Sequence, residues 1–146
     1  MVHKPQTEHL ISQLSEALQC RTEILEAYLF GSVARGDDQA HSDVDVAVYL
    51  ADGELNGSGY GHQAELSADL QRALRRNDID IVILNAATPL LYHRVLRDGV
   101  RVLSRDLSTT TRREAYALSR YCDDLPRLRM IDAIHRARIE RGDFGT

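Results

Sequence analysis

The chain has 146 residues, of which 43% are hydrophobic and 27% are charged, and its formal net charge is −4. This length fits one domain with a substantial core, and the slight acidic excess gives no general reason to expect nucleic-acid binding. No apolar run approaches the roughly 18–20 residues that a membrane-spanning helix needs, and the first ten residues lack the apolar segment of a signal peptide. Two distant cysteines, Cys20 and Cys122, indicate reduced thiols, so we expect a cytoplasmic protein.

The first third of the chain predicts a helix followed by two strands. Thr7 can cap a helix whose apolar side chains recur at a helical period. These side chains are Leu10, Leu14, Ala17 and Leu18. Residues 22–30 (TEILEAYLF) indicate a strand that ends at Gly31-Ser32. Residues 43–50 (DVDVAVYL) alternate strictly, so a second strand has two unlike faces. One face carries Val44, Val46, Val48 and Leu50, and the other carries Asp43, Asp45, Ala47 and Tyr49.

The middle of the chain continues this alternation of elements. Residues 51–61 contain four glycines and predict either a flexible loop or a lid over a cleft. A helix follows, and its inward side chains are Leu66, Leu70, Ala73 and Leu74. The β-branched residues 78–84 (DIDIVIL) predict a third strand. Thr88-Pro89 begins a helix with Leu91, Val95 and Leu96 facing inward, Gly99 ends it, and residues 100–103 form a fourth strand.

The C-terminal region predicts helices. Thr111 and Glu114 have the spacing of a capping box, and Pro126 is expected to divide the region into two helices. Its apolar side chains either cover the sheet or bind a partner. They are Tyr116, Tyr121, Leu128, Ile131 and Ile134. We expect one α/β (α+β) domain with a small mixed sheet of about four strands flanked by helices, in which residues 1–105 form the core and residues 106–146 pack on it. The strands are too few for a doubly wound dinucleotide fold.

Two carboxylates stand on one face of the second predicted strand. Asp43 and Asp45 are two residues apart, so their Cα atoms lie roughly 6.6 Å from each other and their side chains leave the same face. Such a pair repels unless a cation lies between the two groups. Mg²⁺ commonly takes one or two carboxylates together with substrate phosphates. The spacing therefore predicts a magnesium–nucleotide site.

Gly31-Ser32 is the second candidate element of this site. Glycine allows a phosphate to approach the backbone, and a helical turn over residues 32–36 would point its N–H groups at an anion. The Ser32 hydroxyl can donate to a phosphate oxygen. Arg35 either reaches the phosphates or pairs on the surface with Asp37 or Asp38.

The pattern Gly31-Ser32-x10-Asp43-x-Asp45, within LFGSVARGDDQAHSDVDVAVYL, resembles the signature of the polymerase-β-like nucleotidyltransferases. The resemblance implies that family's fold, ATP as the substrate and two Mg²⁺ ions. It also implies nucleotide-binding roles for Gly31, Ser32, Arg35 and Ser42, and catalytic, metal-binding roles for Asp43, Asp45 and a third carboxylate. The apolar-Asp-apolar pattern and an expected deeper position favour Asp80 over Asp78, which we expect at the solvated start of the strand.

The segment that begins at Leu84, and the later YCDD, resemble antitoxins of minimal nucleotidyltransferase/HEPN toxin–antitoxin systems. That resemblance implies AMP transfer from ATP to a tyrosine of a HEPN ribonuclease toxin, with no nucleic-acid or membrane contact. Two alternatives remain: a small-molecule (antibiotic-type) nucleotidyltransferase, and an antitoxin that acts by binding alone. Arg129 and His135 imitate the HEPN ribonuclease spacing, but a tail of about forty residues cannot form that domain.

Overall fold

The computed structural model describes residues 5–36, 43–51 and 59–142. The first half of the chain forms α1 (Pro5–Gln19), β1 (Ile24–Phe30), α2 (Gly31–Arg35), β2 (Val44–Leu50) and α3 (Gly59–Leu74). The second half forms β3 (Ile79–Ile83), a 3₁₀ turn η1 (Leu84–Ala86), α4 (Pro89–Asp98), β4 (Val100–Ser104) and α5 (Leu107–Glu140). The helical turn predicted after the Gly-Ser pair is confirmed as α2.

The four strands form one mixed sheet in the order β3-β2-β1-β4. β1 pairs antiparallel with β2 and with β4, whereas β2 and β3 run parallel. This register places Phe30 opposite Asp45 on one side and Asp80 opposite Asp45 on the other. The prediction of a small mixed sheet of four strands is confirmed.

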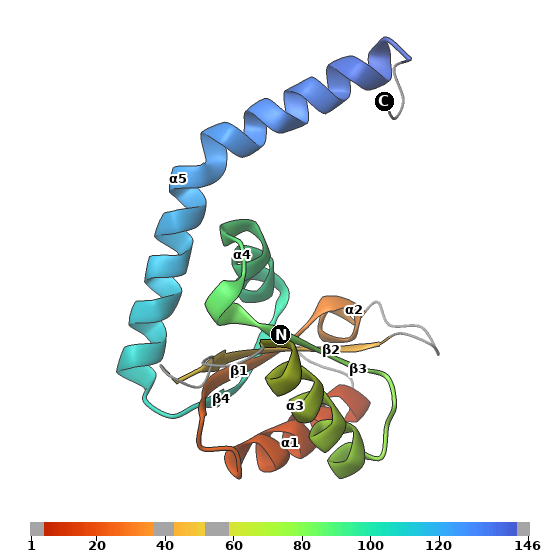
Figure 1. The fold of residues 1–146 in the computed structure, drawn as a ribbon, viewed down its shortest axis with the longest axis vertical. Helices are drawn as coiled ribbons and strands as arrows, with labels where there is room; N and C mark the ends of the chain where they lie inside the picture. The colour runs from red at the N-terminus through yellow and green to blue at the C-terminus, as the bar shows by residue number, and fades with distance from the viewer. Residues whose placement is uncertain (1–4, 37–42, 52–58, 143–146) are drawn as a thin grey trace.

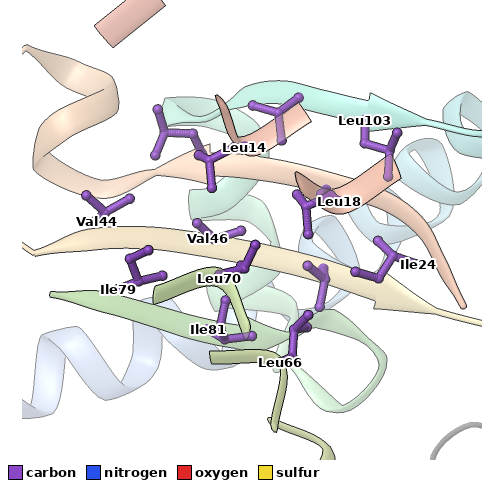
Figure 2. Packing of buried hydrophobic residues seen from close by; sticks show 14 of the residues in the cluster. Leu14, Leu18, Ile24, Val44, Val46, Leu66, Leu70, Ile79, Ile81 and Leu103 are labelled. Carbon is purple, nitrogen blue, oxygen red and sulfur yellow. The ribbon is translucent and has the colours of Figure 1, made fainter. Parts of the chain in front are cut away.

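The main core lies between the sheet and helices α1 and α3 (Figure 2). The predicted alternation of β2 is confirmed, since Val44, Val46, Val48 and Leu50 are all fully buried. Leu14 and Leu18 of α1 pack against them, as do Leu66 and Leu70 of α3. Fully burying one such side chain stabilises the fold by about 1.5–3 kcal/mol, so this layer supplies much of the driving force for folding.

A second, smaller core covers the opposite face of the sheet. There α4 and the first half of α5 pack over side chains of β1 and β2. Its buried members are Tyr28, Ala47, Leu84, Tyr92, Val95 and Ala117. Helix α4 starts as predicted, because the Thr88 hydroxyl accepts a hydrogen bond from the N–H of Leu91 at 3.2 Å. Gly99 follows the last residue of α4, also as predicted.

One buried carboxylate joins α5 to the sheet. Glu26 of β1 is only 1% exposed. Arg113 donates from Nη1 to its Oε1 at 2.8 Å, and the Thr110 hydroxyl donates to its Oε2 at 3.1 Å. The Arg113 guanidinium also lies 4.0 Å from the centre of the Tyr49 ring, as a cation–π contact requires. Because both oxygens of Glu26 have partners, its burial is tolerated.

Further polar and aromatic contacts hold α5 in place beyond Glu26. Glu114 accepts hydrogen bonds of 2.6 Å from the Tyr28 hydroxyl and from Arg101 Nη2. Further along α5, the ring of Tyr121 stacks on that of His93 in α4, with centroids 3.7 Å apart and planes 6° from parallel. The first half of α5 is therefore attached to β1, β4 and α4.

Two details of the predicted helices near the N-terminus are wrong. Thr7 is not a cap: it lies inside α1 and is buried, because it faces the same core as Leu10 and Leu14. Ala73 of α3 is exposed, because the buried stripe of this helix follows Leu66, Leu70 and Leu74 instead. Since α3 begins at Gly59, the predicted loop is shorter at its C-terminal end, and residues 52–58 lie outside the described residues.

The prediction of two C-terminal helices is also wrong. α5 is one helix of 34 residues that begins at Leu107 and contains Pro126. Thr111 therefore lies inside the helix and does not cap it. Pro126 removes one backbone hydrogen bond, and the helix bends partway along its length instead of ending (Figure 1). None of the helices in the described ranges combines the length and apolar character needed to cross a bilayer.

The Arg113–Glu26 contact yields a stability prediction. We expect Arg113→Ala to lower the free energy of unfolding by about 3–5 kcal/mol, because it leaves a buried carboxylate without its cation. The neighbouring Arg112→Ala, at an exposed position, should cost less than about 0.5 kcal/mol. Adding Glu26→Gln to Arg113→Ala should recover part of the loss. Urea denaturation measures all three, and equal losses in the two arginine variants would contradict the assignment.

Candidate active site

Three carboxylates meet at one end of the β2–β3 pair. Asp45 is the second residue of β2, and parallel pairing sets it directly opposite Asp80 of β3. Asp43 precedes β2 by one residue and is exposed. Because the valines of β2 face α1 and α3, the side chain of Asp45 leaves the opposite face of the sheet. The structure thus places Asp80 and Asp43 near enough to Asp45 for both to act on its pKa.

The carboxylates of this cluster repel one another, and the pKa of Asp45 reflects this repulsion. Partial burial and the neighbouring carboxylates of Asp80 and Asp43 raise the pKa of Asp45, and only Arg35 acts to lower it. A carboxylate whose ionisation is opposed in this way is stabilised by a bound cation. Among the described residues, no group of three or more His, Cys, Asp or Glu side chains is arranged so that it could hold a metal ion by itself. Mg²⁺ does not require one, since it binds through one or two carboxylates plus substrate phosphates, and this donor set fits it.

Gly31 turns the chain directly over Asp45. It has a φ of +78°, and a Cβ at this position would lie 2.1 Å from Oδ2 of Asp45. Any side chain would therefore strain the backbone and displace the carboxylate. Ser32 follows within α2, so the predicted Gly-Ser pair stands beside the acidic cluster. The preceding Phe30 is extended and has no polar atom with which to cap α2.

Arg35 ends α2 and lies between two acidic groups. Its Nη1 is 3.6 Å from Oδ2 of Asp98, the last residue of α4, and its charge also acts on Asp45. Asp98 in turn accepts two 3.0 Å bonds from Arg97, and these two arginines hold its pKa below the usual range. The predicted alternative partners Asp37 and Asp38 lie outside the described residues, as does Ser42.

The two candidates for the third carboxylate have different surroundings. Arg76 donates to both oxygens of Asp78, at 2.8 and 2.7 Å, and this pairing lowers the pKa of Asp78. Asp80 instead faces Asp45 across the strand pair. The expectation that Asp80 is the deeper of the two is wrong: Asp80 is exposed, because β3 is an edge strand, and Asp78 is half-buried. Its position in the cluster, not its depth, distinguishes Asp80.

A cleft of about 650 Å³ opens beside Asp45 and Asp80. Its remaining lining comes from Phe30, Gln63, Ala64, Ser67, Ile81, Val82 and Leu91. Sequence reasoning missed these residues, because α3 and α4 contribute to the cleft only through the tertiary fold. The apolar side chains can pack against a planar ring. Asp45 and Asp80 line the same cleft.

Polar side chains of α3 bind the backbone of β3 next to this cleft. Gln63 donates to the carbonyl of Ile81, and the Ser67 hydroxyl donates to the carbonyl of Ile79 at 3.2 Å. Gln71 reaches the Ile79 carbonyl as well, at 3.5 Å. These bonds occupy carbonyl groups on the free edge of the sheet and fix the wall of the cleft.

Comparison with known proteins agrees with this geometry. The 38% identity to the protein adenylyltransferase MntA of Shewanella oneidensis extends over 72 residues, which are 49% of this chain and 48% of that protein. The chain thus matches only about half the length of MntA. A Methanocaldococcus jannaschii protein named as a candidate protein adenylyltransferase is 30% identical over 80 residues, which are 55% of this chain and 81% of that one.

The fold comparison covers more of the molecule. A crystal structure of a toxin–antitoxin with AMP-PNP contains a chain that superimposes with a TM-score of 0.70 and 25% identity. The match covers 86% of this chain and 98% of that chain. The family model described as polymerase beta, nucleotidyltransferase matches residues 12–108, a span that includes α2, the three carboxylates and the whole sheet. By this match, the chain belongs to the polymerase beta nucleotidyltransferase family.

Proposed function

We propose that this chain is a magnesium-dependent protein adenylyltransferase that acts as an antitoxin. It transfers AMP from ATP to a tyrosine of a HEPN ribonuclease toxin and so neutralises the toxin. The observation that carries the proposal is the opposition of Asp45 and Asp80, with Gly31 turning over Asp45, in a chain of this family. The similarity to MntA, and to a chain of a toxin–antitoxin crystallised with AMP-PNP, supports the choice of ATP and of a protein acceptor.

The residues of the site have two proposed roles, in binding the metal ion and in binding the phosphates. Asp43, Asp45 and Asp80 would hold Mg²⁺, and Gly31, Ser32 and Arg35 would contact the phosphates. The ion, when bound, supplies positive charge against the triphosphate and relieves the repulsion at Asp45. Because Gly31 has no side chain, a phosphate group could approach the protein backbone at this position. Arg35, which Asp98 already contacts, adds a second positive charge at the site.

The reaction is an in-line substitution at the α-phosphorus of ATP. The tyrosine oxygen forms a bond to that phosphorus, the bond to the β-phosphate oxygen breaks, and pyrophosphate leaves. Asp80 would accept the proton of the tyrosine hydroxyl; its exposure at the cleft, while Asp45 lies beneath Gly31, supports this role. The negative charge that develops is met by cationic groups and backbone N–H donors, so positioning supplies most of the rate enhancement.

Mass spectrometry of the toxin tests this proposal directly. The chain is incubated with ATP, Mg²⁺ and the product of the neighbouring gene, which the proposal expects to be a HEPN-type toxin, and we expect a mass gain of one or more AMP groups on a tyrosine. Asp80→Asn should slow the transfer about 10²–10⁴-fold, the usual contribution of a general base. Asp78→Asn should leave the rate within about threefold, because Asp78 is engaged by Arg76.

Other outcomes of the same experiment identify the rivals. Neutralisation of the toxin that persists in Asp43→Asn/Asp45→Asn, without any added mass, would establish binding alone as the activity. Transfer of AMP to an aminoglycoside but not to the toxin would establish the small-molecule alternative. Equal loss in the Asp78 and Asp80 variants would contradict the assigned third carboxylate.

The same carboxylates predict stability changes of opposite sign. The pKa of Asp45 is raised from 3.8, so its ionisation destabilises the folded state, increasingly as pH rises above that value. Asp45→Asn should therefore raise the Tm at pH 7 without metal. The pKa of Asp78 is lowered from 3.8, so its charge stabilises the fold above that pH and this gain is lost as pH falls below it. Asp78→Asn should therefore lower the Tm at pH 7.

The change in Tm on adding metal is the control for the Asp45→Asn and Asp78→Asn variants. Differential scanning calorimetry with Mg²⁺ and a non-hydrolysable ATP analogue should show a rise in Tm for wild type and for Asp78→Asn, but little or none for Asp45→Asn. A lower Tm for metal-free Asp45→Asn than for wild type would count against strain at this carboxylate.

Gly31→Ala should abolish most of the AMP transfer, whereas the closely matched substitution Gly36→Ala should not. Gly31 and Gly36 have nearly equal positive φ values, +78° and +79°, so alanine costs about 1–2 kcal/mol of backbone strain at either position. The new Cβ meets Asp45 at Gly31, whereas no atom of the described residues lies within 4 Å of the Cβ position at Gly36. AMP transfer should fall by more than about 10²-fold in Gly31→Ala and remain near wild type in Gly36→Ala; similar losses would show that backbone strain alone is responsible.

A further inference from the structure

The second half of α5 exposes large apolar side chains that nothing in the described fold covers. The buried residues of α5, Thr110 and Ala117, both belong to its first half. Beyond Pro126 the helix leaves the core, and its last described residues stand away from the sheet (Figure 1). We call residues 127–141 the distal arm. Of the two alternatives for the apolar residues of this region, covering the sheet does not hold for Ile131 and Ile134, since they are 39% and 48% exposed.

Three of these side chains form one patch on the distal arm. Ile134 lies four residues after Met130 and three after Ile131, which places all three on neighbouring positions of one helix face. Met130 is the most exposed of them, at 65%. An adaptable thioether beside two branched side chains suits contact with another protein surface.

The charge of the distal arm differs from that of the rest of the chain. It carries five arginines against Asp132 and Glu140, a net charge of +3, whereas the whole chain has a net charge of −4. Arg136 pairs with Asp132 at 3.0 Å, but both side chains are well over half exposed, so water already screens this pair and the arginine can turn to another carboxylate. The apolar patch is thus flanked by positive charge.

We propose that the distal arm is the docking surface for the protein that this chain modifies, and that it binds an apolar strip flanked by carboxylates on that protein. The proposal rests on the proposed function. In the view of Figure 1 the distal half of α5 turns over the side of the molecule that carries α4 and α2. Because α2 begins at Gly31, beside Asp45, a protein held by the arm would lie on the side of the molecule that carries the carboxylates.

The attachment of α5 gives this arm a fixed starting direction. The stack of Tyr121 on His93 lies five residues before Pro126 and holds the helix against α4. The bend at Pro126 then sets the direction of the arm relative to the cleft. A second copy of this chain is a poorer occupant, because two arms of net charge +3 repel when their like faces meet.

Binding and kinetics with the full chain test the docking surface. The probe is the product of the neighbouring gene, the expected toxin, and the variant is Ile131→Asp/Ile134→Asp. We expect the Kd for this protein to rise at least 30-fold in isothermal titration calorimetry. The KM for the acceptor should rise similarly, while kcat at saturating acceptor stays within about threefold. The matched control is Leu107→Asp, an apolar residue of the same helix that is 59% exposed but lies outside the arm.

Charge reversal supplies a second measurement. Arg129→Glu/Arg138→Glu should weaken binding and reduce its dependence on salt, as loss of complementary charge requires. Circular dichroism and the Tm shift with Mg²⁺ and an ATP analogue should match wild type in every arm variant, which shows that the core and the nucleotide site are intact.

Each contrary outcome has its own meaning. Unchanged Kd and KM in the isoleucine variant would overturn the docking surface while AMP transfer stands. Tight, arm-dependent binding without AMP transfer would overturn the proposed function while the docking surface stands. A wild-type dimer in multi-angle light scattering that the same substitutions dissociate would assign the arm to a second copy and overturn the proposal.

Discussion

The opposition of two carboxylates on neighbouring parallel strands is the constraint around which this fold is arranged. Asp45 and Asp80 face each other because β2 and β3 run parallel in that register. The repulsion between them is tolerated because the other face of β2 buries four fully enclosed aliphatic side chains. Burial of that kind is worth far more than the strain of one raised pKa. The stabilising apolar side chains and the acidic cluster thus lie on opposite faces of a single strand.

The part of the site that depends on local sequence could be predicted. Strict alternation from Val44 to Leu50 determines which side chains face the core, since successive residues of a strand point in opposite directions. The Gly-Ser pair predicted a turn, and the turn is α2. The family could be predicted from the same residues, because the spacing between Gly31 and Asp45 is part of its signature. This spacing corresponds to the connection from β1 through α2 to β2.

What the sequence could not predict depends on contacts between distant segments. Glu26 sits in an apolar stretch, and only the fold brings Arg113 to it from 87 residues away. Pro126 was expected to end a helix, but it only bends one that tertiary contacts already hold in place before the proline. The exposure of Asp80 follows from strand order, since alternation alone cannot say which strand lies at the edge. The lining of the cleft by α3 and α4 was hidden for the same reason.

The hydrogen bonds from α3 to β3 have a consequence for how this protein can associate. An edge strand normally offers its backbone to any extended segment, and such pairing is a common route to recognition and to aggregation. Here Gln63, Ser67 and Gln71 already occupy the carbonyls of Ile79 and Ile81. An incoming chain cannot add a fifth strand beside Asp80 without displacing these hydrogen bonds. Pairing with an extended segment of another protein is therefore disfavoured at this edge of the sheet.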